Sequence, residues 1–313
     1  MAIKLYVRRY NAILYYNWGV RQLPFVIKRK YLIIHWGIGT PMNMKKQFNL
    51  RTPISYYGGK QKLAKTVLSF LPEHTLYCEP FLGGAAIFFA KPPSKVEVVN
   101  DTNKELINFY RVCKNRFHDL SSLVRTTLHS REEHDNAWII YNKPQLFDEV
   151  RRAWAVWVLS TQSFSSMLDG SWGYDKSDNT TTQKISNKRE EFTEQLALRL
   201  QHAQIECADA NYIIHSRDQK DSFFYCDPPY FNSNCGHYDG YTEEDFEALL
   251  KTLSTIKGKF ILSSYPGSLL KSYMKANNWQ MWSVEQGVSV NAKGGYQKRK
   301  IEVLTANFEL KAG

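Results

Sequence analysis

The sequence predicts an α/β fold, a doubly wound parallel sheet interrupted by an inserted, mainly helical segment. From residue 51 onward, short apolar runs alternate with stretches of helical spacing, which is the order of a β-α-β sheet. The same alternation returns after residue 205, whereas residues 111–200 break it. A chain of 313 residues, 43% of them hydrophobic, can bury one large domain with such an insertion.

The first half of the sheet is predicted from residues 60–115. Residues 60–72 carry leucine and valine at helical spacing, and Pro72 closes that helix. Strands follow at 75–81 and 95–101, each with an acid near its carboxyl end, and helices at 83–92 and 103–115.

The second half follows the insert. It contains a strand and a helix within 205–214, a strand at 222–230, a helix at 242–256 and strands at 259–265 and 299–308. Thr242 and Asp245 stand at the capping positions of the 242–256 helix. Inside the insert we expect a helix at 148–164 and a long polar loop at 165–184. The predicted parts are thus a sheet domain of residues 44–110 and 201–313, an insert of 111–200 and an N-terminal extension of 1–43.

The first 43 residues differ from the rest of the chain. Residues 1–50 hold nine of the 41 basic residues and none of the 30 acidic ones, so the net charge of +11 is concentrated there. The segment is rich in Tyr, Trp, Ile and Arg and shows no clear periodicity. Two interpretations stay open: an upstream extension outside the native structure, which we favour, or a basic, aromatic arm that binds nucleic acid.

Cysteine content and hydropathy indicate in which cellular compartment the protein is expected. Five cysteines without a CxxC pair indicate neither a disulfide framework nor a zinc site, so we expect a cytoplasmic protein without a bound metal. Cys235 and His237 lie close together, but two ligands do not make a metal site. No apolar run approaches the ~18 residues of a membrane span, and no signal peptide is recognisable.

Four predicted strand ends carry residues that are typical of ligand sites. They are Glu79 to Gly84, Asn100-Asp101, Asp209, and Asp227-Pro228-Pro229-Tyr230. In open α/β sheets, ligands bind at the carboxyl ends of the strands. The lack of a full G-x-G-x-x-G argues against a dinucleotide, whereas an acid after the second strand suits a ribose. S-adenosylmethionine fits this pattern, since its sulfonium and amino groups also suit an acid-rich pocket.

Three motifs, in this order, resemble those of the adenine-N6-specific DNA methyltransferases of the D12, Dam-like class: Tyr56-Tyr57-Gly58-Gly59-Lys60, Glu79-Pro80-Phe81-Leu82-Gly83-Gly84 and Asp227-Pro228-Pro229-Tyr230. The similarity covers roughly residues 52–310, is loose in the insert and leaves out residues 1–43. It implies a Rossmann-like, S-adenosylmethionine-dependent methyltransferase sheet. It also implies that the insert is a target-recognition domain, and that the enzyme acts as a monomer on double-stranded DNA.

The resemblance further implies roles for individual residues. Catalysis falls to Asp227, Pro228, Pro229 and Tyr230. Cofactor binding falls to Tyr56, Gly58, Gly59, Lys60, Glu79, Phe81, Gly83, Gly84, Asp101, Asp209 and Asp227. Two positions depart from the family pattern: Tyr56 stands where tryptophan is frequent, and Ala210 follows Asp209 where an aromatic residue is usual.

The Asp-Pro-Pro-Tyr tetrapeptide suits this chemistry on physical grounds as well. An exocyclic amine attacks a methyl group once its lone pair is freed from conjugation with the ring. The Asp227 carboxylate and the Pro228 carbonyl can accept its two hydrogens, and proline stiffness holds both acceptors in place. Tyr230 offers a ring for a base that has been extruded from the duplex.

The insert is expected to bind DNA. Its predicted contacts are Arg151, Arg152, Trp172, Tyr174, Lys176 and Lys184. We also expect residues 231–246 to close over the extruded base. Alternatives that stay open are cytosine N4 or RNA as the acceptor, a non-catalytic DNA-binding protein and a nicotinamide-dependent oxidoreductase. A restriction endonuclease partner is neither indicated nor excluded.

Overall fold

The computed structural model describes residues 5–8, 11–14, 50–231, 240–287 and 299–311. The chain divides into two units, Met1–Met44 and Lys45–Gly313. In the first unit, strands β1 (Leu5–Arg8) and β2 (Asn11–Leu14) form an antiparallel pair. Cys235, His237 and the rest of residues 232–239, half of the segment expected to close over the base, lie outside the described residues.

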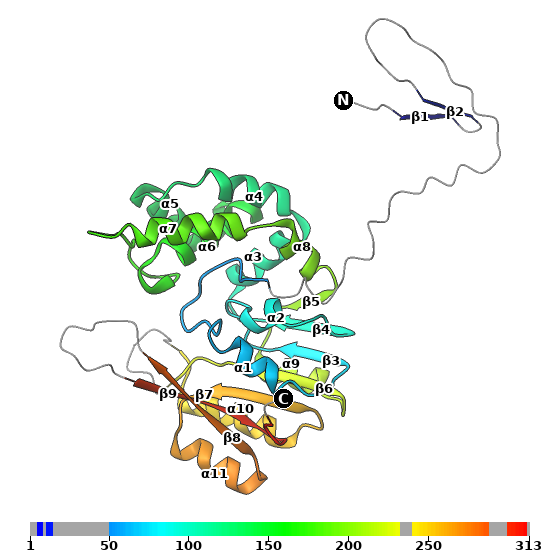
Figure 1. Ribbon diagram of the computed structural model, residues 1–313, viewed down its shortest axis with the longest axis vertical. Coiled ribbons are helices and arrows are strands. Elements are labelled where there is room, and N and C mark those ends of the chain that lie inside the picture. The colour runs from blue at the N-terminus through cyan, green and yellow to red at the C-terminus, as the bar shows by residue number, and fades with distance from the viewer. Residues whose placement is uncertain (1–4, 9–10, 15–49, 232–239, 288–298, 312–313) are drawn as a thin grey trace, which may run out of the picture. The chain divides into compact units, whose positions relative to one another are not determined.

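The second unit is built on a seven-stranded sheet in the order β5-β4-β3-β6-β7-β9-β8 (Figure 1). The strands are β3 (Leu76–Glu79), β4 (Val96–Asn100), β5 (Ala203–Glu206), β6 (Ser222–Cys226), β7 (Lys259–Ser264), β8 (Gln280–Gly287) and β9 (Arg299–Ala306). The chain winds outward from β3 through β4 to β5, and then from β6 through β7 to the other edge. The topological switch point, where such sheets bind ligands, therefore lies between β3 and β6.

One edge of the sheet differs from the prediction of a parallel sheet. Strands β5, β4, β3, β6 and β7 are parallel, but β9 runs antiparallel to β7, and β8 runs antiparallel to β9. Strand β8 and the preceding helix α11 (Ser268–Asn277) were not predicted. Antiparallel neighbours need only a loop between them, so β9 follows β8 without the intervening helix on which the prediction of parallel strands rested.

Two layers of helices cover the sheet, as a doubly wound fold requires. One layer contains α1 (Ala64–Ser69), α2 (Ala86–Ala90) and α3 (Lys104–Asn115), and the other contains α9 (Ala210–Arg217), α10 (Glu243–Thr255) and α11. Successive residues of β6 point into opposite cores: Phe223 and Tyr225 pack with the first layer, Phe224 and Cys226 with the second. Burial on both faces explains why this strand is a continuous apolar run.

The insert forms a helical layer beyond the sheet (Figure 1). Its helices are α4 (Phe117–Thr126), α5 (Arg131–Asn142), α6 (Glu149–Gln162), α7 (Thr180–Glu191) and α8 (Glu194–Leu200), with short 3-10 turns at Pro144–Leu146 and Phe164–Ser166. Almost all of α6 is buried among its neighbours. Among the helices of the described residues, none has the length and apolar character that a membrane crossing requires.

Two predicted boundaries move for local reasons. The 165–184 loop ends at Asn179, because the Asp175 carboxylate accepts hydrogen bonds from the backbone and hydroxyl of Thr181 and so starts α7 at Thr180. The helix expected at 83–92 begins only at Ala86, because Ala85 has a left-handed φ of 57°. The capping box of α10, in contrast, is confirmed, with Thr242 and Asp245 bonded reciprocally.

The side chain of Asn100 joins three segments at the carboxyl edge of the sheet. It is fully buried at the end of β4. Its Nδ2 donates to the carbonyls of Pro80 (2.9 Å) and Ala208 (3.0 Å), and its Oδ1 accepts from the Ala208 backbone N–H (2.9 Å). The segments that leave β3 and β5 are thereby held against the end of β4.

We expect Asn100→Ala to lower the free energy of unfolding by about 2–3 kcal/mol, because backbone groups of the buried Pro80 and the half-buried Ala208 lose their partners. Urea denaturation measures the change. Asn277→Ala, which removes one exposed amide bond on α11, is the matched control and should change stability by less than about 0.5 kcal/mol. Equal effects of the two substitutions would contradict a joining role for Asn100.

Candidate active site

A cavity of about 990 Å³ opens at the switch point of the sheet. It is lined by the ends of β3, β4 and β6, by the start of α9, by the segment before α1 and by a turn of the insert. Every predicted catalytic and cofactor-binding residue lines it: Tyr56, Gly58, Gly59, Lys60, Glu79, Phe81, Gly83, Gly84, Asp101, Asp209, Asp227, Pro228, Pro229 and Tyr230. The three motifs, far apart in the sequence, thus surround one space.

The glycine motif is shaped by the ring of Tyr56. Gly83 has a left-handed φ of 47°, and a Cβ there would lie 3.2 Å from the Tyr56 ring. A Cβ on Gly84 would approach the Tyr56 Cβ to 2.9 Å, closer than real contacts allow. The hydroxyl of Tyr110 on α3 donates to the Gly83 carbonyl (2.8 Å) and so holds the turn in place. Glycine at these two positions therefore lets the segment before α1 pack onto the end of β3.

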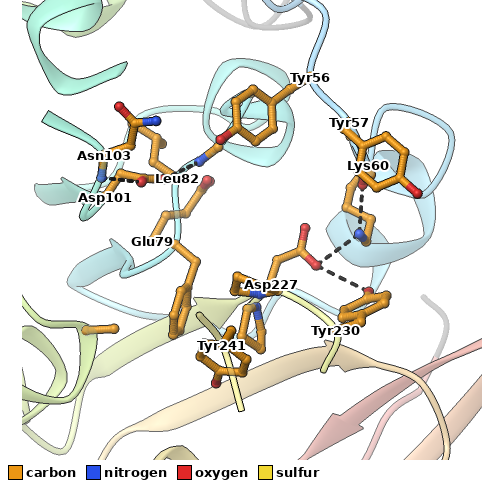
Figure 2. Close-up of a pocket in the computed structure, with 18 of the residues that line it drawn as sticks. Tyr56, Tyr57, Lys60, Glu79, Leu82, Asp101, Asn103, Asp227, Tyr230 and Tyr241 are labelled. Carbon is orange, nitrogen blue, oxygen red and sulfur yellow. Dashed lines mark hydrogen bonds and ion pairs between the residues drawn. The ribbon is translucent and has the colours of Figure 1, made fainter. Parts of the chain in front are cut away.

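Asp101 is held by backbone donors. Its Oδ2 accepts from the Gly83 N–H and its Oδ1 from the Asn103 N–H, both at 2.9 Å. Burial raises the pKa of this carboxyl, and these hydrogen bonds oppose the rise. Asn103 in turn caps α3 and donates to the hydroxyl of Tyr141 in the insert (2.9 Å). The side chains of Asp101 and Asn103 lie together at one end of the cavity (Figure 2).

Two further carboxylates are fixed in different ways. Glu79, only 2% exposed, accepts a hydrogen bond from the Tyr77 hydroxyl at 2.5 Å. Burial raises the pKa of Glu79 to about 8. Asp209 caps α9 by accepting a hydrogen bond from the Tyr212 N–H at 2.9 Å, the common structural role of an acid before a helix.

Asp227 is held by two side chains, Lys60 and Tyr230. Its Oδ1 pairs with Lys60 Nζ at 2.9 Å and accepts from the Tyr230 hydroxyl at 3.3 Å (Figure 2). Lys60 also donates to the Gly58 carbonyl (2.8 Å), and the Tyr230 hydroxyl also contacts Ser263 Oγ (2.9 Å). Burial raises the pKa of Asp227, and Lys60 counteracts this. Since both bonds use Oδ1, Oδ2 has no protein partner among the described residues and is available to a substrate.

The predicted aromatic DNA contacts form a cluster on the insert. Trp172 and Tyr174 stack with ring centroids 5.5 Å apart, and the Arg131 guanidinium carbon lies 4.6 Å from the Trp172 centroid. Tyr174 is 54% exposed. A charged group, two rings and an exposed edge are thus gathered on one surface of the insert.

The predicted basic DNA contacts separate into two kinds. Arg152 makes two hydrogen bonds to Glu105 of α3, at 2.6 and 2.9 Å, and Lys184 Nζ donates to Ser166 Oγ at 3.1 Å. These two side chains therefore have internal partners. The other two are exposed: Arg151 and Lys176.

The prediction missed residues that line the cavity from other elements. Tyr265 directly follows β7, so the strand-end rule would have found it. Phe164, which is 58% exposed, lines the cavity from the insert and had no such signal. It reaches the site because α6 ends at Gln162 and Ser163 is extended (φ −75°, ψ 150°), after which the Phe164 backbone N–H donates to the Ser171 carbonyl at 2.8 Å.

The family model of the D12 class N6 adenine-specific DNA methyltransferases matches residues 56–293. The chain belongs to this family. This methyltransferase is 25% identical over 288 residues to the Type II methyltransferase M1.LlaDCHI of Lactococcus lactis subsp. cremoris, covering 84% of this chain and 98% of that protein. It is 26% identical over 285 residues to the DNA adenine methylase of Vibrio cholerae, with coverages of 85% and 97%. The fold, the family and adenine-N6 DNA methylation as the activity are thereby confirmed.

The cavity of the methyltransferase suits S-adenosylmethionine, the cofactor that the family implies. Of Glu79, Asp101, Asp209 and Asp227, only Asp227 forms an ion pair within the described part of the chain. The remaining acids are bonded to backbone amides or to a phenol. Carboxyl groups that lack a cationic partner suit a ligand with positive charge and hydroxyl donors, which a sulfonium, an ammonium and a ribose supply.

We expect Gly83→Ala to lower the free energy of unfolding by about 1–2 kcal/mol, because alanine is strained at a left-handed φ. Its Cβ would also press on the Tyr56 ring and disturb the cavity. Chemical denaturation measures the loss. Gly267→Ala is the control, since Gly267 has an extended φ of −156° and nothing within 4 Å of the added methyl group. Gly83→Ala with wild-type stability would contradict this account of the turn.

Proposed function

We propose that Asp227 and Pro228 carry the methyl transfer by accepting the two hydrogens of the adenine N6 amine. The support is the orientation of Asp227: Lys60 and Tyr230 hold Oδ1 from two sides, and Oδ2 is left for a substrate. Acceptors fixed in advance draw the nitrogen lone pair out of the ring and aim it at the carbon it attacks. The proton leaves once the nitrogen is cationic, so no strong base is needed.

The cofactor site in this proposal is the carboxylate-lined part of the cavity. Asp101 would accept from the ribose hydroxyls, Glu79 would face the charged amino acid end, and Tyr56, Lys60 and Phe81 would line the site with the glycine turns at 58–59 and 83–84. Asp209 would lie beside the adenine, although its carboxylate already caps α9. Bound here, S-adenosylmethionine supplies the methyl group on an electrophilic carbon.

The acceptor base would be extruded from double-stranded DNA, because N6 is out of reach inside a duplex. Tyr230 is suited to receive it. Its hydroxyl is bonded to Asp227 and Ser263, and its ring packs edge-on against Tyr265, with centroids 4.5 Å apart. A ring that is fixed in this way can stack on a base without losing much rotamer freedom. Phe164 would approach the base from the insert side.

Target reading is assigned in this proposal to the insert, residues 111–200. The Trp172–Tyr174 stack and the exposed Arg151 and Lys176 are suited to contacts with DNA. We propose that the enzyme acts as a cytoplasmic monomer. The likeness to a Type II methyltransferase supports a restriction–modification role, with a partner endonuclease that cuts the unmethylated sequence.

Asp227→Ala should reduce methyl transfer by about 100-fold or more, since the amine loses the acceptor that orients it. Transfer of labelled methyl from S-adenosylmethionine to DNA measures this, and nucleoside analysis identifies the product as N6-methyladenine. The control is Asp221→Asn, at the opposite end of β6 and outside the cavity. Transfer at the parental rate by Asp227→Ala would refute the assignment.

Lys176→Ala should reduce the slope of log K against log salt concentration for DNA binding by about one, the value for one lost phosphate contact. Lys184→Ala tests the same predicted role for a lysine that already donates to Ser166. Titrations of labelled duplex at several salt concentrations give the slopes, with Lys271→Ala on α11 as the control. An unchanged slope for Lys176→Ala would remove that lysine from the interface.

A further inference from the structure

Behind the cavity, the phenol of Tyr77 reaches the carboxylate of Glu79. The two residues lie two apart on β3, so their side chains point to the same face of the sheet. The Tyr77 hydroxyl donates to Oε1 of Glu79 at 2.5 Å. Glu79 lines the cavity, whereas Tyr77 is fully buried and is not among the lining residues. Tyr77 can therefore influence a ligand only through Glu79.

The ammonium group of Lys91 lies over the face of the Tyr77 ring. Lys91 Nζ is 4.2 Å from the ring centroid, and the same atom pairs with Glu97 at 2.6 Å. Arg199 of α8 also pairs with Glu97 and donates to the carbonyl of Phe88 (2.9 Å). These three charged side chains are all at least 94% buried, so the ammonium group is fixed in position. A cation over a phenol draws electron density from the ring and makes its hydroxyl a stronger donor.

We infer that Tyr77 is a positioning residue for the cofactor: its hydroxyl binds Oε1 of Glu79 and favours the ionised carboxylate, so that cofactor binding is coupled to the release of a proton from Glu79. The inference rests on the proposed cofactor site. It adds to that site a residue that no motif of the family resemblance includes, and a dependence of affinity on pH.

The charge state of Glu79 is set by groups on every element around it. They are Tyr77 and Cys78 of β3, Lys91 after α2, Tyr110 of α3, Arg199 of α8, Tyr225 of β6 and Asp227 after β6. Burial raises the pKa of Glu79 to about 8, Asp227 adds to the rise, and Tyr77, Lys91 and Arg199 oppose it. Without ligand, Glu79 is therefore mainly protonated at neutral pH.

A cationic ligand binds the ionised form of Glu79 more tightly, so binding below pH ~8 must displace the carboxyl proton to the buffer. The affinity should rise about tenfold for each unit of increasing pH up to pH ~8 and then level off. In Tyr77→Phe, the ionised form loses its hydrogen bond, which raises the pKa of Glu79 further. The affinity then stops rising only at a higher pH than in the wild type, and binding at pH ~7 is weakened about tenfold.

The experiment is calorimetric titration of the full chain with S-adenosylmethionine from pH ~6 to ~9, in two buffers that differ in ionisation enthalpy. Wild type should release close to one proton at pH ~7 and almost none at pH ~9. Tyr77→Phe should still release about half a proton at pH ~9, the amount that corresponds to tenfold weaker binding at pH ~7. Glu79→Gln measures the proton release that comes from all other groups. In this variant the number of protons released should be the same at pH ~7 and pH ~9. Tyr212→Phe, on the exposed face of α9, is the matched control and should follow wild type.

Kinetics provide a second measurement. Tyr77→Phe should raise KM for S-adenosylmethionine at pH ~7 and leave kcat within about twofold, because Asp227 and Tyr230 are unchanged. Binding by wild type without proton release, or identical pH profiles for wild type and Tyr77→Phe, would overturn the inference and leave the proposed function intact. Failure of S-adenosylmethionine to bind at any pH would refute the proposed cofactor site itself.

Discussion

The ion pair between Lys60 and Asp227 is the interaction on which the site depends most. It joins the segment before α1 to the tetrapeptide after β6 and is nearly dry, with side-chain exposures of 5% and 20%. A buried ion pair contributes little net stability, because desolvation cancels most of the attraction, whereas removal of one partner leaves a buried charge uncompensated. The pair is therefore better understood as a device for orientation. It fixes Oδ1 of Asp227, and with Tyr230 on the same oxygen it leaves Oδ2 without a partner among the described residues.

The same desolvation governs the other acids at the carboxyl edge. Parallel strands all deliver their ends to one side of the sheet, and the order β4-β3-β6 places Asp101, Glu79 and Asp227 around one cavity. Each carboxylate is compensated differently: Asp101 by backbone amides, Glu79 by a phenol and Asp227 by an ammonium. Only the first and last of these partners lie at the cavity. Tyr77, the partner of Glu79, is buried in the core. The charged groups near Tyr77 extend from Lys91 to Arg199 of α8.

Much of this arrangement was readable from the sequence, because it follows from local chemistry. The apolar run of β6, the turn signals after β3 and the prolines after Asp227 are local, and the strand-end rule converts them into one site. The antiparallel edge was missed because strand direction depends on non-local pairing, whereas the helical spacing of Leu270, Tyr273 and Met274 in α11 was present in the sequence and overlooked. Phe164 was missed for a different reason: its place at the cavity depends on the end of α6 at Gln162 and on the bond from its backbone to Ser171, and neither has a local sequence signal.

The basic residues of the insert show most clearly where sequence reasoning stops. A count of Arg and Lys suggests a surface for DNA, but several of these cations are used inside the protein. Arg152 pairs with Glu105, and Lys188 of α7 donates to the carbonyl of Thr52 at 2.6 Å, in the segment that leads to Tyr56. Together with Asn103–Tyr141, these bonds tie the insert to the start of α3 and to the segment before α1 through buried or half-buried polar contacts. Such contacts are costly to break, so a displacement of the insert by DNA would also shift α3 and the segment before α1. The insert and the segments that line the cavity therefore belong to one compact unit.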